Sequence, residues 1–171
     1  MRFLVLTLSL LAGAPALAMS QTVQQELSNP AKVGQGKFTY YFWDVYNATL
    51  YAPEGQWKKN GPFALKLEYL RDFEGKEIAQ RSIEEMEKQG AKDKEQLSVW
   101  REEMASIFPD VKDGDALTGV VTSEGNTRFF YNESLIGEIK DEAFTQRFFD
   151  IWLAENTSEP ELREKLLGET D

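Results

Sequence analysis

The chain has 171 residues and a formal net charge of −10, with 29 acidic against 19 basic side chains and neither histidine nor cysteine. This acidity argues against nucleic acid, whose phosphates demand a basic face, and against electrostatic docking on anionic lipid. Without histidine and cysteine there is no Ser-His-Asp or Cys-His nucleophile system, no disulfide, and neither of the two commonest zinc ligands. A carboxylate-only metal site remains possible, but the sequence has no calcium-loop spacing. We expect no metal site, no cofactor and no nucleic-acid partner.

Residues 1–18 have the composition of a secretory signal peptide. Arg2 supplies a positive charge, and Phe3 to Leu11 form an apolar run that is short for a membrane span. Ala16-Leu17-Ala18 fits the small-x-small cleavage pattern. We expect cleavage after Ala18, export to the periplasm and no stable membrane anchor afterwards; an uncleaved anchor is the alternative.

The remaining chain divides into a leader and one domain. Residues 19–30 are polar and rich in glutamine, which indicates a loosely held leader. Residues 31–171 have the length of a single domain.

The domain opens with a stretch from Val33 to Pro53 that holds seven aromatic side chains. Successive side chains of a strand point to opposite faces, and here both faces are bulky, so we expect a strand covered on both sides. Asp44 interrupts the aromatic run and indicates a turn or a bulge. A second strand, Val45 to Ala52, is expected to fold back beside the first until Pro53 ends it.

Residues 63–70 alternate between apolar and polar side chains, which predicts a half-exposed strand. Two helices are expected next, one at about 76–88 that Gly90 ends, and one that starts at Asp93, which has capping-box spacing with Gln96. Their charged faces are expected to be solvated. The buried stripes are predicted to be Ala79, Ile83 and Met86 on the first helix, and Leu97, Trp100, Met104 and Ile107 on the second.

Three further strands, separated by hairpin-length turns, and two further helices complete the chain. The strands are expected at 116–122, 127–131 and 134–139. Asp141 can cap a long helix to about Glu155, with Phe144, Phe148, Ile151 and Trp152 on one face. Ser158 and Glu161 have capping-box spacing for a short helix that ends at Gly168. This order predicts an α+β fold with a mostly antiparallel sheet.

The motifs of residues 34–53 carry a family resemblance: Gly-x-Gly-Lys, an aromatic strand, then Val-Tyr-x-Ala-x-Leu-Tyr-Ala-Pro. They resemble the opening hairpin of the chalcone isomerase family, and most closely its bacterial, exported chalcone-isomerase-like branch. The resemblance continues in Gly114-Asp115, Gly137-Glu138-Ile139, 148–153 and 157–163. It implies an open-faced β-sandwich, with helices layered on one face of an antiparallel sheet and a ligand cleft between the two layers.

The resemblance also implies where a catalytic site would lie. Plant chalcone isomerases hold the phenolate and ketone of their substrate with an arginine, a tyrosine, an asparagine and threonines. Aligning the motifs places the arginine on Lys37, one threonine on Tyr46, the tyrosine on Ile78, the asparagine on Glu85 and the last threonine on Ile151. Isoleucine donates no hydrogen bond and lysine lacks the bidentate fork of arginine, so we expect no chalcone isomerase activity and name no catalytic residue.

Lys37 is the cation at this strand, and it shares one face with Gln35, Thr39 and Tyr41. At the mouth of an aromatic cleft it could hold a carboxylate, as an arginine does in the fatty-acid-binding branch of the family. The alternative is a surface lysine that snorkels at a strand end. The candidate ligand-binding residues are Lys37, Thr39, Tyr41, Tyr46, Ile151 and Trp152.

Three functions remain open from the sequence. The first is a non-catalytic periplasmic domain that binds a small apolar or amphipathic anionic ligand, such as a fatty acid. The second is a lyase or isomerase that uses Lys37, Tyr41 or Tyr46. The third is a protein-partner binding domain that uses its acidic surface or the loop around Trp57. A roomy cleft with Lys37 inside favours the first function, and a filled layer between sheet and helices favours the third.

Overall fold

The structure is a computed structural model that describes residues 19–169. The predicted signal peptide lies outside the described residues. Within the described part, no helix combines the length and the apolar character that a membrane span requires.

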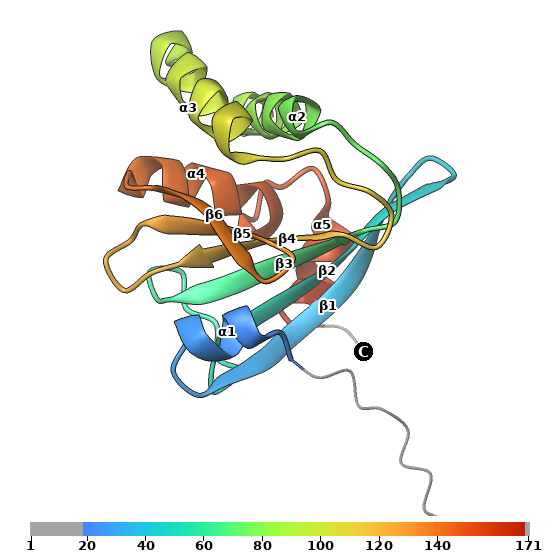
Figure 1. The fold of residues 1–171 in the computed structure, drawn as a ribbon, viewed down its shortest axis with the longest axis vertical. Helices are drawn as coiled ribbons and strands as arrows, with labels where there is room; N and C mark the ends of the chain where they lie inside the picture. Colours follow the sequence, from blue (N-terminus) through green and yellow to red (C-terminus); the bar gives the residue numbers. More distant parts are fainter. Residues whose placement is uncertain (1–18, 170–171) are drawn as a thin grey trace, which may run out of the picture.

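A six-stranded antiparallel sheet forms the base of the fold (Figure 1). Each strand pairs with the next one in the chain, so the sheet order is the sequence order. The strands are β1 Pro30–Tyr40, β2 Trp43–Pro53, β3 Phe63–Tyr69, β4 Ala116–Val121, β5 Thr127–Tyr131 and β6 Ser134–Ile139. The hairpin-length turns therefore predicted the mostly antiparallel sheet correctly, and the fold class is α+β.

Four helices pack with one face of this sheet into a single apolar core (Figure 1). They are α2 Gly75–Lys88, α3 Lys94–Ile107, α4 Glu142–Leu153 and α5 Pro160–Leu166. The short α5 lies directly against β1, because Gly34 has no side chain there. A Cβ on Gly34 would lie 2.1 Å from the carbonyl oxygen of Lys165.

The predicted helix stripes and two of the predicted caps are present. Asp93 accepts hydrogen bonds from the backbone N–H groups of Glu95 and Gln96, and Asp141 accepts one from Phe144. The cap predicted at Ser158 was wrong. Glu159 occupies the N-cap position of α5, and the Ser158 hydroxyl instead donates to Glu85 at 2.6 Å.

The opposite face of the sheet is partly covered by α1 Gln21–Glu26, which lies in the segment expected to be a loose leader. Val23 and Leu27 are buried there against Ala64, Val120 and Phe130. The Glu133 carboxylate also accepts the N–H of Thr22 at 2.8 Å. These contacts hold residues 21–27 against the sheet, because two apolar residues in a polar segment suffice to cover an apolar patch.

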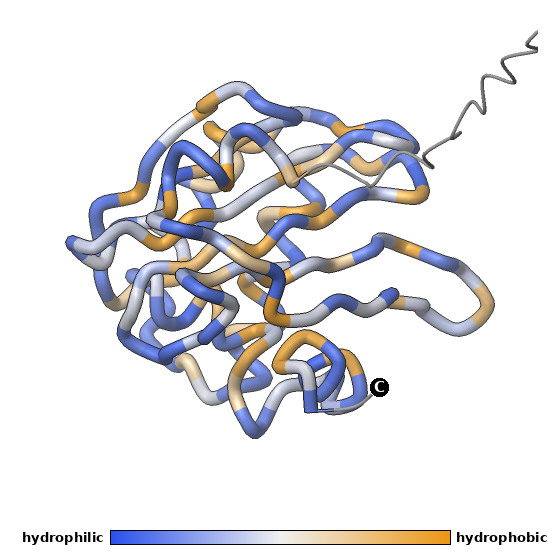
Figure 2. Tube along the Cα trace, turned by 90° about the horizontal axis from the view of Figure 1, so that it is seen from below, coloured by the Kyte–Doolittle hydropathy of each residue, from blue (hydrophilic) through white to orange (hydrophobic). Residues whose placement is uncertain are grey.

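The expectation that the aromatic hairpin is covered on both faces was wrong at its end. The chain turns at Tyr41 and Phe42, beyond the body of the molecule, as Figures 1 and 2 show. The side chains of Tyr41 and Phe42 are 79% and 94% exposed. The irregularity predicted at Asp44 is a β-bulge: Thr39 pairs with Asp44 and Phe38 with Tyr46, which leaves Val45 as the extra residue.

Candidate ligand-binding site

A cavity of about 360 Å³ lies between the sheet and helices α2 and α4, where the resemblance implies a cleft. Its volume falls within the range of small-molecule sites. Most of its wall is apolar and aromatic. These residues are Phe38, Val45, Leu65, Leu67, Phe73, Ile78, Phe108, Leu117, Phe129, Phe148, Phe149 and Ile151.

The floor of the cavity comes from side chains that alternate along the strands. Leu65 and Leu67 of β3 and Leu117 of β4 are two residues apart or cross-strand partners, so they share the helix-facing side. Gly119 continues this floor without a side chain. A Cβ at Gly119 would lie 2.9 Å from the Phe149 ring, so glycine lets that ring reach the sheet.

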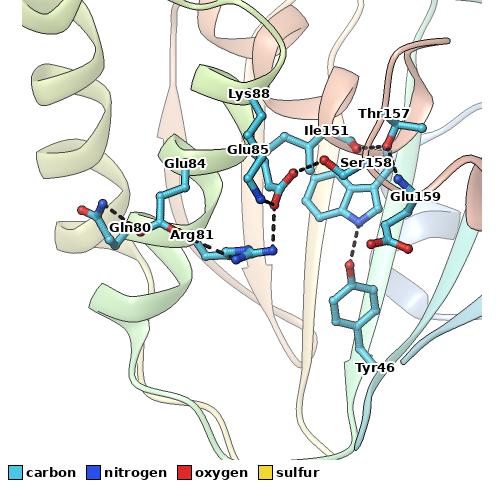
Figure 3. Close-up of polar contacts among 11 residues, drawn as sticks. Tyr46, Gln80, Arg81, Glu84, Glu85, Lys88, Ile151, Thr157, Ser158 and Glu159 are labelled. Carbon is cyan, nitrogen blue, oxygen red and sulfur yellow. Dashed lines mark hydrogen bonds and ion pairs between the residues drawn. The ribbon is translucent and has the colours of Figure 1, made fainter. Parts of the chain in front are cut away.

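One end of the cavity is polar and begins with Tyr46 and Trp152. The Trp152 indole N–H donates to the Tyr46 hydroxyl oxygen at 2.9 Å (Figure 3). Burial raises the pKa of Tyr46, so its hydroxyl stays protonated at neutral pH. Because the tryptophan fills one acceptor position, the hydroxyl hydrogen of Tyr46 remains available to a ligand.

Tyr69 supplies a second phenol to the same cavity. Its side chain is 4% exposed and its ring packs edge-on against Tyr46, with 5.9 Å between centroids. Burial raises the pKa of Tyr69 as well, so this hydroxyl is also neutral. Among residues 19–169, no side chain or backbone group forms a hydrogen bond with it. This hydroxyl is not among the polar side-chain atoms of the described residues that are both fully buried and unpaired, so it is open to the cavity, where it can donate to a ligand oxygen.

Charged side chains of α2 close the polar end, with Glu85 at their centre (Figure 3). The Glu85 carboxylate pairs with Arg81 at 2.8 Å and with Lys88 at 2.9 Å, and it accepts the Ser158 hydroxyl. Burial opposes ionisation of Glu85, but the hydrogen bonds from Lys88 and Ser158 and the charge of Arg81 outweigh it and lower the pKa of this carboxyl. The cluster ties α2 to the loop that precedes α5.

Glu159 lies beside this cluster in the same loop. The Thr157 hydroxyl holds the loop by donating to the Ile151 carbonyl at 2.6 Å and accepting the N–H of Glu159 at 3.2 Å (Figure 3). Burial, and after it the charge of Glu85, raises the pKa of Glu159. Glu77, Glu85 and Glu159 thus line the cavity together with one basic side chain, Arg81.

The structure brings together three of the six residues that the sequence nominated for ligand binding. Tyr46, Ile151 and Trp152 line the cavity. Lys37, Thr39 and Tyr41 do not.

Strand alternation explains this division. Phe38 faces the cavity, so its neighbours Lys37 and Thr39 take the other side of β1. There the Lys37 ammonium pairs with Asp44 at 2.7 Å and the Thr39 hydroxyl donates to the same carboxylate at 2.9 Å. Tyr41 lies in the exposed turn.

Sequence reasoning missed Arg81, Tyr69 and Glu159. The expectation that the charged face of α2 is solvated was wrong for Glu85, which is 8% exposed. A signal was present, because Ile78, Arg81 and Glu85 recur every three or four residues beside the apolar stripe. Tyr69 carried no such signal, since an aromatic residue in an alternating strand is usually only core.

Comparison with known proteins agrees with this architecture. An open antiparallel sheet with helices on one face and a cavity between the layers defines a ligand-cleft α+β domain. Residues 18–168 match the model of the chalcone isomerase-like family, and the chain belongs to that family.

Two known proteins are similar to this chain, one in sequence and one in fold. An uncharacterized protein of Haemophilus influenzae is 31% identical over 139 residues, which cover 81% of this chain and 68% of that protein. The crystal structure of a fatty-acid binding protein of Arabidopsis thaliana superposes with a TM-score of 0.63 at 13% identity, covering 82% of this chain and 88% of that one. At this identity the structural likeness shows the fold alone.

Proposed function

We propose that this protein is a non-catalytic binding protein for a small, largely apolar molecule that carries one oxygen-bearing polar end. The observation that carries this proposal is the apolar cavity with two neutral phenols, Tyr46 and Tyr69, one of which has no hydrogen-bond partner among residues 19–169. A medium- or long-chain fatty acid is the first candidate. The fold shared with the Arabidopsis fatty-acid binding protein supports this choice.

Apolar contact supplies most of the affinity in this proposal. Each methylene that leaves water contributes about 0.8 kcal/mol, and most of the cavity wall offers aromatic and aliphatic surface to receive it. Affinity should therefore rise with chain length until the cavity is full and then level off. The polar end fixes the orientation of the ligand and contributes less.

The charges at the polar end favour a neutral oxygen group over an ionised carboxylate. Arg81, the basic side chain of the lining, is already paired with Glu85, and Glu77 and Glu159 lie in the same wall. A fatty acid therefore binds with its carboxyl group protonated, and its carbonyl oxygen accepts hydrogen bonds from the two phenols. Lys37, which is half exposed and paired with Asp44, supplies no anchor.

Calorimetry with dodecanoic acid and its methyl ester tests this proposal. Both should bind the wild-type protein at pH 6, and only the acid should weaken as the pH rises to 8. Acid and ester that both fail to bind would refute the proposal. An acid that binds more tightly at pH 8 than at pH 6 would show that the site selects the carboxylate.

The alternative function, a lyase or isomerase, is supported by only one of its candidate residues. Of the three side chains it requires, only Tyr46 lies in the cavity, and burial raises the pKa of that phenol and keeps it protonated, so it is not available as a base. Apolar side chains stand at Ile78 and Ile151, where chalcone isomerases have donors. Incubation with chalcone should therefore give no flavanone above the rate in buffer.

We further propose that the protein acts in the periplasm after removal of residues 1–18. The positive charge of Arg2, the apolar run and the Ala-x-Ala site support this. An exported binding protein of this kind would carry or sequester apolar molecules outside the cytoplasm.

A further inference from the structure

The tip of the β1–β2 hairpin exposes four consecutive aromatic side chains. Tyr40, Tyr41, Phe42 and Trp43 are 49%, 79%, 94% and 58% exposed. Elsewhere in residues 19–169, the only other large hydrophobic side chains with comparable exposure are Val99 and Leu135, which stand singly. Water contact with four adjacent aromatic rings is costly, so this tip is expected to have an occupant.

From the tip of the hairpin to its base, the side chains change from apolar to amphipathic to cationic, which is the order found across a lipid interface from the acyl chains to the headgroups. Phe42, which has no polar atom, is the most exposed of the four. Trp43 and the two tyrosines flank it, and these side chains prefer the headgroup level of a bilayer, where the ring is apolar and its polar atom is hydrated. Cations follow at the base: the Arg71 guanidinium lies 4.3 Å from the Trp43 ring centre, and that of Arg81 lies 5.9 Å from the Tyr40 ring centre.

The small area of the tip favours lipid over a protein partner. Four aromatic side chains at these exposures offer roughly 500 Å². A stable protein interface needs about 800 Å² from each partner, on a surface that is broad enough to exclude water. A narrow, projecting hairpin can instead enter a soft lipid phase that closes around it (Figures 1 and 2).

The hairpin also lies next to the cavity. Phe38, Val45 and Tyr46 belong to it and line the cavity, and Arg81 contributes both to the lining and to the contact with Tyr40. A tip held in a bilayer would therefore bring the cavity close to the lipid surface.

We propose that the Tyr40–Trp43 tip is a membrane-docking element that inserts into the interface of a zwitterionic bilayer. Docking depends on apolar insertion, since the chain carries a net charge of −10 and anionic lipid would repel it. Apolar ligands could then pass between bilayer and cavity without crossing bulk water. This consequence rests on the proposed function, whereas docking itself does not.

Vesicle flotation of the ligand-free mature protein with phosphatidylcholine vesicles tests the proposal. The wild-type protein should float with the vesicles, and Phe42→Ser should weaken this partitioning by about tenfold or more, the scale of one buried phenylalanine. Leu135→Ser is the matched control, because Leu135 is 58% exposed on β6 and should bind like wild type. Tyr69→Phe should also bind vesicles like wild type, which separates docking from ligand binding.

Fluorescence gives a second measurement on the same samples. Trp100 and Trp152 are buried at 5% and 7% exposure, and Trp57 is half-buried against the core. The part of the blue shift and of the quenching by brominated phosphatidylcholine that is lost in Trp43→Phe should therefore report Trp43. The proposal is overturned if the wild-type protein does not float, if Phe42→Ser floats as well as wild type, or if Leu135→Ser loses binding equally.

Discussion

Tyr69→Phe separates ligand binding from stability more cleanly than any other change in the cavity. The substitution removes one hydroxyl and keeps the ring that packs against Tyr46 and Phe73. Because no described residue bonds this hydroxyl, the folded protein loses no hydrogen bond. Removing a hydroxyl that forms no hydrogen bond with the described residues should leave the free energy of unfolding unchanged or raise it by about 1 kcal/mol.

The same change should weaken the ligand. A hydrogen bond between neutral groups contributes about 0.5–1.5 kcal/mol, so the dissociation constant for dodecanoic acid methyl ester should rise roughly two- to twelvefold. Calorimetry measures this affinity, and urea denaturation of the ligand-free protein measures stability. Unchanged or increased stability together with a loss of affinity is the expected signature of a donor reserved for a ligand.

Tyr46→Phe is the contrasting variant, because its hydroxyl has a structural task. The substitution leaves the indole N–H of Trp152 without its acceptor, which should cost about 1–3 kcal/mol of unfolding free energy. Tyr51→Phe is the control. Tyr51 lies on the opposite face of β2, where it packs against the apolar cluster that contains Val23 and Leu27, so this change should leave ligand affinity unchanged. The reasoning fails if Tyr69→Phe destabilises the protein as much as Tyr46→Phe, or if it leaves affinity at the wild-type value.

Four further predictions follow from single residues. Trp100→Ala should lower the unfolding free energy by about 3–5 kcal/mol, because this side chain is 5% exposed in the core; an unchanged melting temperature would contradict it. Glu159→Gln should stabilise the protein above about pH 4.5 and lose its effect at lower pH. The raised pKa means that ionisation of Glu159 disfavours the folded state, and denaturation at pH 4 and pH 7 measures the difference. Lys37→Ala should leave the affinity for dodecanoic acid unchanged, because Lys37 is outside the cavity lining. Weaker binding of the acid by this variant in calorimetry would show that Lys37 is an anchor. Mass spectrometry of a periplasmic extract should find the protein starting at Met19, and an intact Met1 form in the membrane fraction would refute export.

The sequence predicted the parts of the fold that local physics determines. The stripe of Leu97, Trp100 and Met104 and the cap at Asp93 were correct, because helical spacing and capping need only neighbouring residues. Hairpin-length turns likewise predicted the antiparallel sheet. The cap at Ser158 failed because a residue on another helix, Glu85, competes for its hydroxyl, and a local pattern contains no information on that partner.

The sequence also predicted the wrong basic residue for the cavity, and for a related reason. Lys37 stands out in the sequence because it precedes an aromatic strand, but alternation along β1 gives Phe38 to the cavity and Lys37 to the other face. The sequence pattern did not single out Arg81, because α2 carries many other charged residues. Whether Arg81 lines the cavity depends on how α2 packs over the sheet, and this orientation follows from tertiary contacts rather than from the helical period.

The family alignment nevertheless located the walls of the site. Four of the five aligned positions, Tyr46, Ile78, Glu85 and Ile151, line the cavity, although only Tyr46 keeps a hydroxyl. A fold preserves where a backbone position lies and leaves the chemistry of its side chain free to change. Isoleucine at 78 and 151 adds apolar wall where a reaction would need donors for a developing oxyanion, which are commonly the largest catalytic contribution. In the proposed binding role, isoleucine at both positions would therefore extend the surface that holds an apolar ligand.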